Sequence, residues 1–152
     1  RGVVREEAKS SPLLRGVADV WGPTDVYGVT HLPKDAQILL WGQVLTGMKP
    51  NDPPLAGAKN EPMMPLAWTR ELPGEGGGKQ KIFTTTMGAA VDLENEGLRR
   101  LIINACYWAT GLEVPAKANV EMVSEFKPTY FGFGKFKPGI KPADVMGQGS
   151  QR

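Results

Sequence analysis

The sequence predicts an α/β fold whose sheet is incomplete within this chain. Residues 79–111 have the pattern of a strand, a turn and an amphipathic helix with capping residues at both ends. Residues 37–45, QILLWGQVL, form a nearly continuous β-favouring apolar run, which is typical of a strand buried on both faces. Because one strong helix covers only one face, we expect sequence upstream of Arg1 or a partner, including a second copy of the chain, to complete the sheet.

Length and composition are those of one globular domain: 152 residues, 41% hydrophobic and 22% charged. The 19 glycines and 13 prolines predict that much of the chain forms turns and loops. Residues 126–152 carry five basic residues against one acidic residue, a charge of +4 that leaves −2 for the rest of the +2 chain. We expect residues 1–125 to form the α/β unit and residues 126–152 an extended aromatic and basic tail packed on it.

The elements before the helix are predicted from apolar runs bounded by Gly and Pro. Residues 1–11 are polar and indicate a turn or a frayed helix end. A loop is expected over residues 50–62, which hold four prolines, and a hairpin connection over the glycine-rich residues 73–78. Besides the run at 37–45, short strands are expected at 19–27 (ending in a turn), 63–72, 81–86 and 120–123.

The helix is expected to begin near Asp92 or Leu93, where the Asp92 carboxylate can cap free backbone N–H groups, and to stop at Gly111. Arg99 and Arg100 fall outside its apolar stripe and are expected in solvent. The stripe recurs at three- and four-residue spacing and comprises Leu98, Leu101, Ile102, Ala105, Trp108 and Ala109.

The single cysteine, Cys106, lies within this helix, on or beside the stripe, and we expect it to be a small buried hydrophobe. A glutaminase nucleophile would instead need a strand-to-helix elbow and a histidine partner. One cysteine forms no intramolecular disulfide, so cytoplasmic and periplasmic or secreted locations both stay open. No apolar run approaches the roughly 18 residues that a membrane span requires, so we expect no membrane association.

Five segments, taken in order, carry a resemblance to a known family. They are WGPTDVYGV (21–29), GQVLTGMKPNDPP (42–54), NEPMMPLAW (60–68), IFTTTMGAAVDLENEGLRRLIINACYWATGLEVP (82–115) and PTYFGFGKFKPGIKPADV (128–145). Together they resemble the C-terminal half of ThuA-like, or trehalose-utilisation type, proteins, and most closely a bacterial subgroup common in planctomycete-like genomes. The resemblance covers nearly the whole chain.

This resemblance implies a flavodoxin-like, class I glutamine-amidotransferase-like fold, in which a mostly parallel sheet carries helices on both faces. The family's first strands would precede Arg1, and the chain would be a fragment of the domain. The resemblance also implies a role in carbohydrate metabolism, with trehalose or oxidised disaccharides as suggested substrates. Many members follow the IFTTTMG strand with a histidine, whereas Gly88 is followed by Ala89 here, so no role of that histidine transfers to this chain.

Candidate ligand-binding residues cluster where the strand at 81–86 leads into the helix. In open α/β sheets, ligands bind at the carboxyl ends of strands, and a helix start offers N–H groups to an anion or to sugar hydroxyls. The residues placed there are Thr85, Thr86, Gly88, Asp92 and Asn95. The alternative is structural, with Asp92 as the helix cap and the threonines as β-formers.

A second candidate is the turn GPTDVYG, in which Asp25 and Tyr27 are suited to carbohydrate contact by hydrogen bonding and ring stacking. An ordinary turn residue and a half-buried tyrosine account for them slightly better. His31 has no neighbour at metal-ligand spacing, so we predict no metal and no cofactor. The glycine-rich PGEGGGK (73–79) lacks the GxxxxGK[ST] pattern and joins two strands, which argues against a phosphate loop.

The tail interleaves aromatic residues with lysines, as surfaces that bind single-stranded nucleic acid do. We favour the interpretation that its aromatics hold the tail across the domain's own apolar surface, and we expect no nucleic acid partner. The aromatic residues are Phe126, Tyr130, Phe131, Phe133 and Phe136.

Two functions therefore stay open for the chain. The first is a ThuA-like domain that binds or acts on a small-molecule carbohydrate near residues 86–95. The second is a non-catalytic interaction or structural module, completed by another chain or by further N-terminal sequence.

Overall fold

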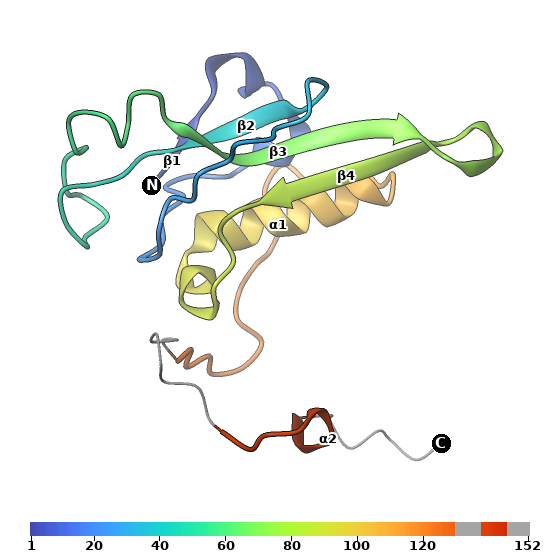
Figure 1. Ribbon diagram of the computed structural model, residues 1–152. Coiled ribbons are helices and arrows are strands. Elements are labelled where there is room, and N and C mark those ends of the chain that lie inside the picture. The colour runs from blue at the N-terminus through green and yellow to red at the C-terminus, as the bar shows by residue number, and fades with distance from the viewer. Residues whose placement is uncertain (130–137, 146–152) are drawn as a thin grey trace.

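The computed structural model describes residues 1–129 and 138–145, and its body is a four-stranded sheet with one long helix packed beneath it (Figure 1). The sheet order is β1-β2-β3-β4. The longest helix, α1, spans Glu96–Ala109, and a short helix, α2, spans Pro142–Val145. The strands are β1 (Gly2–Val4), β2 (Gln37–Gly42), β3 (Met64–Pro73) and β4 (Lys79–Thr85). The short 3-10 helices are η1 (Glu6–Ala8), η2 (Pro12–Leu14), η3 (Glu75–Gly77) and η4 (Ala90–Glu94).

The α/β class predicted from the sequence is confirmed, but the direction of the strands differs from the expectation. All three pairings among the described strands are antiparallel, whereas the family resemblance implies a mostly parallel sheet. Antiparallel neighbours need only short connections, and β3 and β4 are joined by the predicted hairpin around residues 74–78. The β4–α1 unit, the strands near 37–45, 63–72 and 81–86, and the helix stop before Gly111 (φ 78°) also agree with the prediction.

Three predicted elements near the ends of the unit were wrong. Residues 1–11 contain β1, because Val3 and Val4 pair with Trp41 and Leu40 of β2. Residues 19–27 form no strand: Asp19 has a φ of 49°, a bend falls at residues 23–24, and Val20, whose carbonyl accepts from the Gly2 N–H at 2.7 Å, packs into the core. Residues 120–123 form no strand, since side-chain donors from α1 hold the chain there and Val123 is fully exposed.

Two register shifts in the β2–β3 pairing explain the continuous apolar run of β2. They fall between Ile38 and Leu40 and between Leu40 and Trp41. A regular strand places alternate residues on opposite faces, whereas an irregularity lets consecutive residues share a face. Leu39 and Leu40 are both buried in the one core cluster, so a helix on one side suffices to cover them.

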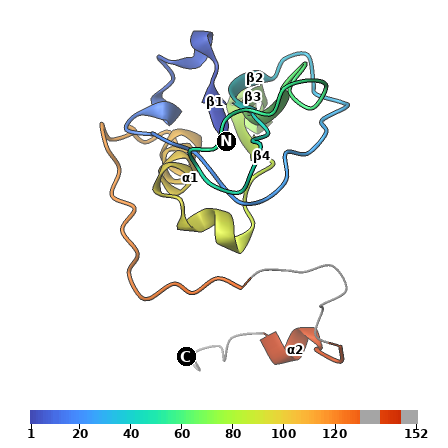
Figure 2. The same cartoon turned by 90° about the vertical axis from the view of Figure 1, so that its left-hand side faces the viewer.

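The core lies between the sheet and α1, and Figure 2 shows the helix on one side of the sheet. Leu98 and Leu101 of α1 are fully buried against Leu40 of β2 and Leu66 and Ala67 of β3. Burial of apolar surface in this layer stabilises the fold by roughly 25 cal/mol per Å². None of the helices in the part of the chain that the structure describes is long and apolar enough to cross a membrane.

Both ends of the helix stripe need correction. Asn95, not Asp92, caps α1, because its Oδ1 accepts from the Leu98 N–H at 2.8 Å, and Asp92 belongs to the preceding η4. Ala109 and Cys106 are exposed, although both were expected on or beside the buried stripe.

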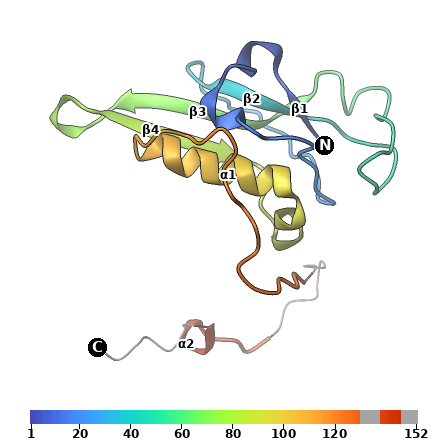
Figure 3. The ribbon, with the colours of Figure 1, turned by 180° about the vertical axis from the view of Figure 1, so that it is seen from behind.

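Arg100 is buried rather than solvated. Its guanidinium donates to the Ala118 carbonyl at 3.0 Å and the Gly16 carbonyl at 3.2 Å, and it pairs with Glu96 at 2.5 Å. These partners are distant in sequence or one turn away, and they satisfy the buried charge. Figure 3 shows the segment after α1 turning back along the helix, where Arg99 also donates to the Val120 carbonyl at 3.0 Å.

The tail prediction is tested at few positions. Phe126 is 39% exposed. The other aromatics named for the tail, Tyr130, Phe131, Phe133 and Phe136, lie outside the described residues. Packing of the tail on the domain therefore stays a prediction.

Asn104 connects η2 to α1 from a fully buried position. Its Nδ2 donates to the carbonyls of Leu13 and Arg15, each at 2.9 Å. Its Oδ1 has no hydrogen-bond partner among the described residues. The side chain thus holds the segment that closes one edge of the core.

We expect Asn104→Ala to lower the free energy of unfolding by about 2–4 kcal/mol, because two buried carbonyls lose their donors. Denaturant titration measures the loss. Cys106→Ala, at an exposed position on the same helix, serves as the control and should change stability by less than about 0.5 kcal/mol. Equal effects of the two substitutions would contradict the anchoring role.

Candidate functional site

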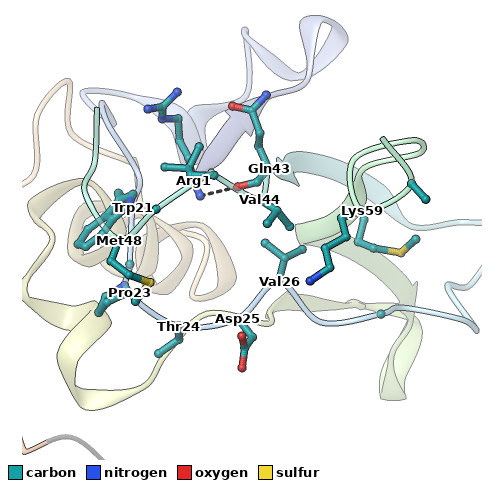
Figure 4. A pocket seen from close by; sticks show the side chains of 16 residues that line it. Arg1, Trp21, Pro23, Thr24, Asp25, Val26, Gln43, Val44, Met48 and Lys59 are labelled. Atoms are coloured by element: carbon teal, nitrogen blue, oxygen red, sulfur yellow. Dashed lines mark hydrogen bonds between the residues drawn. The ribbon is translucent and has the colours of Figure 1, made fainter. Parts of the chain in front are cut away.

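A cavity of about 430 Å³ opens between the loop at residues 21–28 and the loop at residues 43–59 (Figure 4). The 43–59 loop follows the end of β2, and the 21–28 loop adjoins the start of β1, where the Gly2 N–H donates to the Val20 carbonyl at 2.7 Å. Its lining residues are Arg1, Trp21, Gly22, Pro23, Thr24, Asp25, Val26, Gly28, Gln43, Val44, Leu45, Gly47, Met48, Ala58, Lys59 and Met64.

The second of these loops is held by the amide of Asn60. Its Oδ1 accepts from the Val44 N–H at 2.8 Å, and its Nδ2 donates to the carbonyls of Val44 (2.9 Å) and Leu55 (2.6 Å). The Arg1 guanidinium also donates to the Pro50 and Asp52 carbonyls. A stretch rich in proline offers few N–H donors for a regular ladder, so these side-chain bonds supplement the backbone bonds from Thr46 to Pro53 and from Leu55 to Val44, each at 2.9 Å.

The first loop is held by Asp92, which lies beneath it. Thr24 Oγ1 donates to the Asp92 carboxylate, 2.8 Å from each oxygen. Gly22 packs directly on this carboxylate, since a Cβ built at Gly22 would overlap Asp92 Oδ1 and lie 2.8 Å from Met87 Cε. The GPTD turn is therefore seated on a buried acidic side chain that is remote in the sequence.

Asp92 is 1% exposed, and hydrogen-bond donors contact both oxygens of its carboxylate. Besides Thr24, the N–H groups of Gly88 (3.1 Å) and Ala89 (3.2 Å) donate to its Oδ2. No Lys or Arg forms an ion pair with it among residues 1–129 and 138–145. A buried carboxylate without such donors would be strongly unfavourable, so Asp92 fixes both the GPTD turn and the β4–α1 connection.

The residues predicted at the strand end serve this connection. Thr85 Oγ1 accepts from the Met87 N–H at 3.1 Å, and the Thr86 N–H donates to the Leu66 carbonyl at 2.9 Å. Asn95 caps α1, and its Nδ2 donates to the Asp19 carbonyl at 2.8 Å. Together with Gly88 and Asp92 they lie behind the cavity and are not among its lining residues. A ligand role for these five residues stays a prediction.

Of the predicted pair in the GPTD turn, Asp25 lines the cavity, and Tyr27, which is 54% exposed, does not. In Figure 4 the Lys59 ammonium extends from its loop toward the segment that carries Asp25. Trp21 and Met48 form a wall on the other side of the same cavity. The site thus combines an apolar wall with one acidic side chain, Asp25, and two basic side chains, Lys59 and Arg1.

The amino group of Arg1 also borders the cavity and donates to the Gln43 carbonyl at 2.9 Å. Burial, and next the nearby Arg1 guanidinium, lower the pKa of this amino group, while the charge of Asp92 acts in the opposite direction. The local field therefore has contributions from both signs of charge.

Sequence reasoning did not single out Gln43, Met48 or Lys59 as site residues. They lie in the 43–59 loop, which has no periodic pattern and is positioned by the bonds of Asn60 and Arg1 together with backbone bonds within the loop. His31 is exposed with its Nδ1 2.9 Å from Thr30 Oγ1. In the part of the chain that the structure describes, no group of three or more His, Cys, Asp or Glu side chains is placed to hold a metal ion.

Comparison of the chain with protein-family models, with curated proteins and with solved structures finds no match.

Gly22→Ala is expected to lower the free energy of unfolding by about 1–3 kcal/mol, because the new methyl group overlaps the Asp92 carboxylate. Gly28→Ala is the matched control in the same loop, since a Cβ there meets nothing within 4 Å. Thermal unfolding of the two variants measures the difference. A Gly22→Ala protein as stable as Gly28→Ala would show that the turn is not seated on Asp92.

Proposed function

We propose that this chain is the C-terminal part of a ThuA-like, flavodoxin-like domain and that it binds a carbohydrate, such as trehalose or an oxidised disaccharide, in the cavity between the 21–28 and 43–59 loops. The observation that carries the proposal is the juxtaposition of Trp21 with Asp25 and Lys59 around one cavity. The family assignment rests on the resemblance of the five sequence segments.

The chemistry of sugars fits this lining. A pyranose ring offers apolar C–H faces to an aromatic or thioether wall and hydroxyl groups to charged or amide side chains. Trp21 and Met48 supply the wall, and Asp25 and Lys59 supply an acceptor and a donor. The cavity of about 430 Å³ is within the range of small-molecule sites.

Binding is favoured over hydrolysis by the acidic groups at the site. Glycosidic bond cleavage generally uses two carboxyl groups that flank the bond. Asp25 is the sole carboxylate among the lining residues, and Asp92 is buried behind Thr24. We therefore propose recognition of the sugar, with any chemistry dependent on groups other than those lining this cavity.

A second candidate function is an interaction module completed by another chain. It is favoured by β4, which pairs with β3 on one side and ends the described sheet on the other.

Asp25→Ala and Lys59→Ala are each expected to weaken sugar binding about tenfold or more, because a hydrogen bond to a charged group is lost. Titration with trehalose and with a keto-disaccharide, followed by tryptophan fluorescence and calorimetry, measures the affinity. Lys34→Ala removes an exposed lysine that does not line the cavity and should leave the affinity unchanged. A folded wild-type protein that binds neither sugar would overturn the proposal.

A further inference from the structure

The outer edge of β4 presents unpaired backbone groups along one side. The hydrogen bonds Gly74 N–H to Gly78 O (2.8 Å) and Thr86 N–H to Leu66 O (2.9 Å) lie at the two ends of the β3–β4 ladder. They show which residues of β4 form hydrogen bonds with β3. With the register Thr69↔Phe83 and Ala67↔Thr85, even-numbered residues of β4 bond to β3 and odd-numbered residues direct their N–H and C=O groups outward. No other described residue accepts from or donates to these outward groups.

The charged residues that would discourage strand addition are bound within the chain. Edge strands commonly use lysines to block pairing with another strand. Lys79 pairs with Glu71 at 2.7 Å, and Lys81 donates to the Trp108 carbonyl at 2.8 Å and lies 5.2 Å from the centre of the Trp108 ring. The remaining stretch of the edge, residues 82–85, is Ile-Phe-Thr-Thr, which is uncharged and β-favouring.

An apolar flank of α1 is also left uncovered. Arg100 and Asn104 mark the side of α1 that faces η2 and residues 16 and 118, and the stripe of Leu101 faces the sheet. By helical geometry Ile102, Cys106 and Ala109 lie on the opposite flank, where Ile102 packs partly against the core and Cys106 and Ala109 are exposed. In Figure 2, η2 and β4 lie on different sides of α1, so this flank is on the β4 side.

We propose that a second copy of the chain pairs its β4 with this edge, antiparallel and about a two-fold axis at Phe83, to form one continuous eight-stranded sheet. This register sets Phe83 against Phe83 of the second copy, and Lys81 against Thr85. No like charges oppose each other, and the outward N–H and C=O groups of both copies become paired. The exposed flanks of the two α1 helices meet beneath the new junction. The proposal is independent of sugar binding.

Thr85→Pro tests the pairing, because proline removes an outward N–H while leaving the β3–β4 ladder intact. Thr85→Ala is the matched control, since it removes the same hydroxyl but keeps the N–H. We expect sedimentation equilibrium of the full chain to show a concentration-dependent dimer for wild type and Thr85→Ala. For Thr85→Pro the dimer dissociation constant should rise at least about tenfold, because each copy loses a backbone hydrogen bond.

Hydrogen exchange of the wild-type protein gives a second test that needs no variant. Amides of Lys81, Phe83 and Thr85 should become protected as the concentration rises, whereas those of Ile82 and Thr84 should be protected throughout. A monomer at every concentration, equal dimerisation of the proline and alanine variants, or outward amides that exchange freely in the dimer would each overturn the proposal.

Discussion

The Asp92 carboxylate is the interaction on which the candidate site depends, because it joins the GPTD turn to the β4–α1 connection, and the bond from Asn95 Nδ2 to the Asp19 carbonyl reinforces this link. It accepts from Thr24 in the GPTD turn and from Gly88 and Ala89 in the β4–α1 connection. The groups that contact this carboxylate all donate hydrogen bonds to it. The NH2 group of an Asn side chain at this position would itself be a donor and could not accept these bonds. Glycine is needed at position 22 because a Cβ there would overlap the Asp92 carboxylate, and not because the backbone adopts a positive φ.

A second constraint is that α1 covers the sheet from one side only. The register shifts in β2–β3 place Leu39 and Leu40, and likewise Leu66 and Ala67, in the same core. Apolar residues that are adjacent in sequence are thereby buried by one helix. The continuous apolar run of β2 consequently gives no argument for a second covering layer, although it is the pattern that two-sided burial would produce.

Local signals in the sequence were sufficient for β3, β4, their hairpin and the end of α1 at Gly111, because apolar alternation and glycine act over a few residues. They were insufficient where long-range partners decide. Arg100 is buried because the carbonyls of Gly16 and Ala118 receive it, and Asp92 is a loop anchor rather than a helix cap because Thr24 reaches it. The cavity itself could be predicted only at Asp25, since its other walls are loops placed by side-chain and backbone hydrogen bonds that have no local sequence pattern.

The incorrect burial predictions on α1 carry information of their own. A helix stripe is as wide as the surface it covers, and the stripe of α1 extends past the sheet to Ala109, with Cys106 beside it. By helical geometry these residues lie on the flank of α1 toward the edge of β4, where the outward backbone groups of Lys81, Phe83 and Thr85 have no partner among the described residues. Two independent observations, the exposed residues beside the apolar stripe of α1 and the outward backbone groups of β4, thus favour an additional strand at the same edge of the sheet. A strand added beside β4 satisfies both, whereas cover on the opposite face of the sheet satisfies neither.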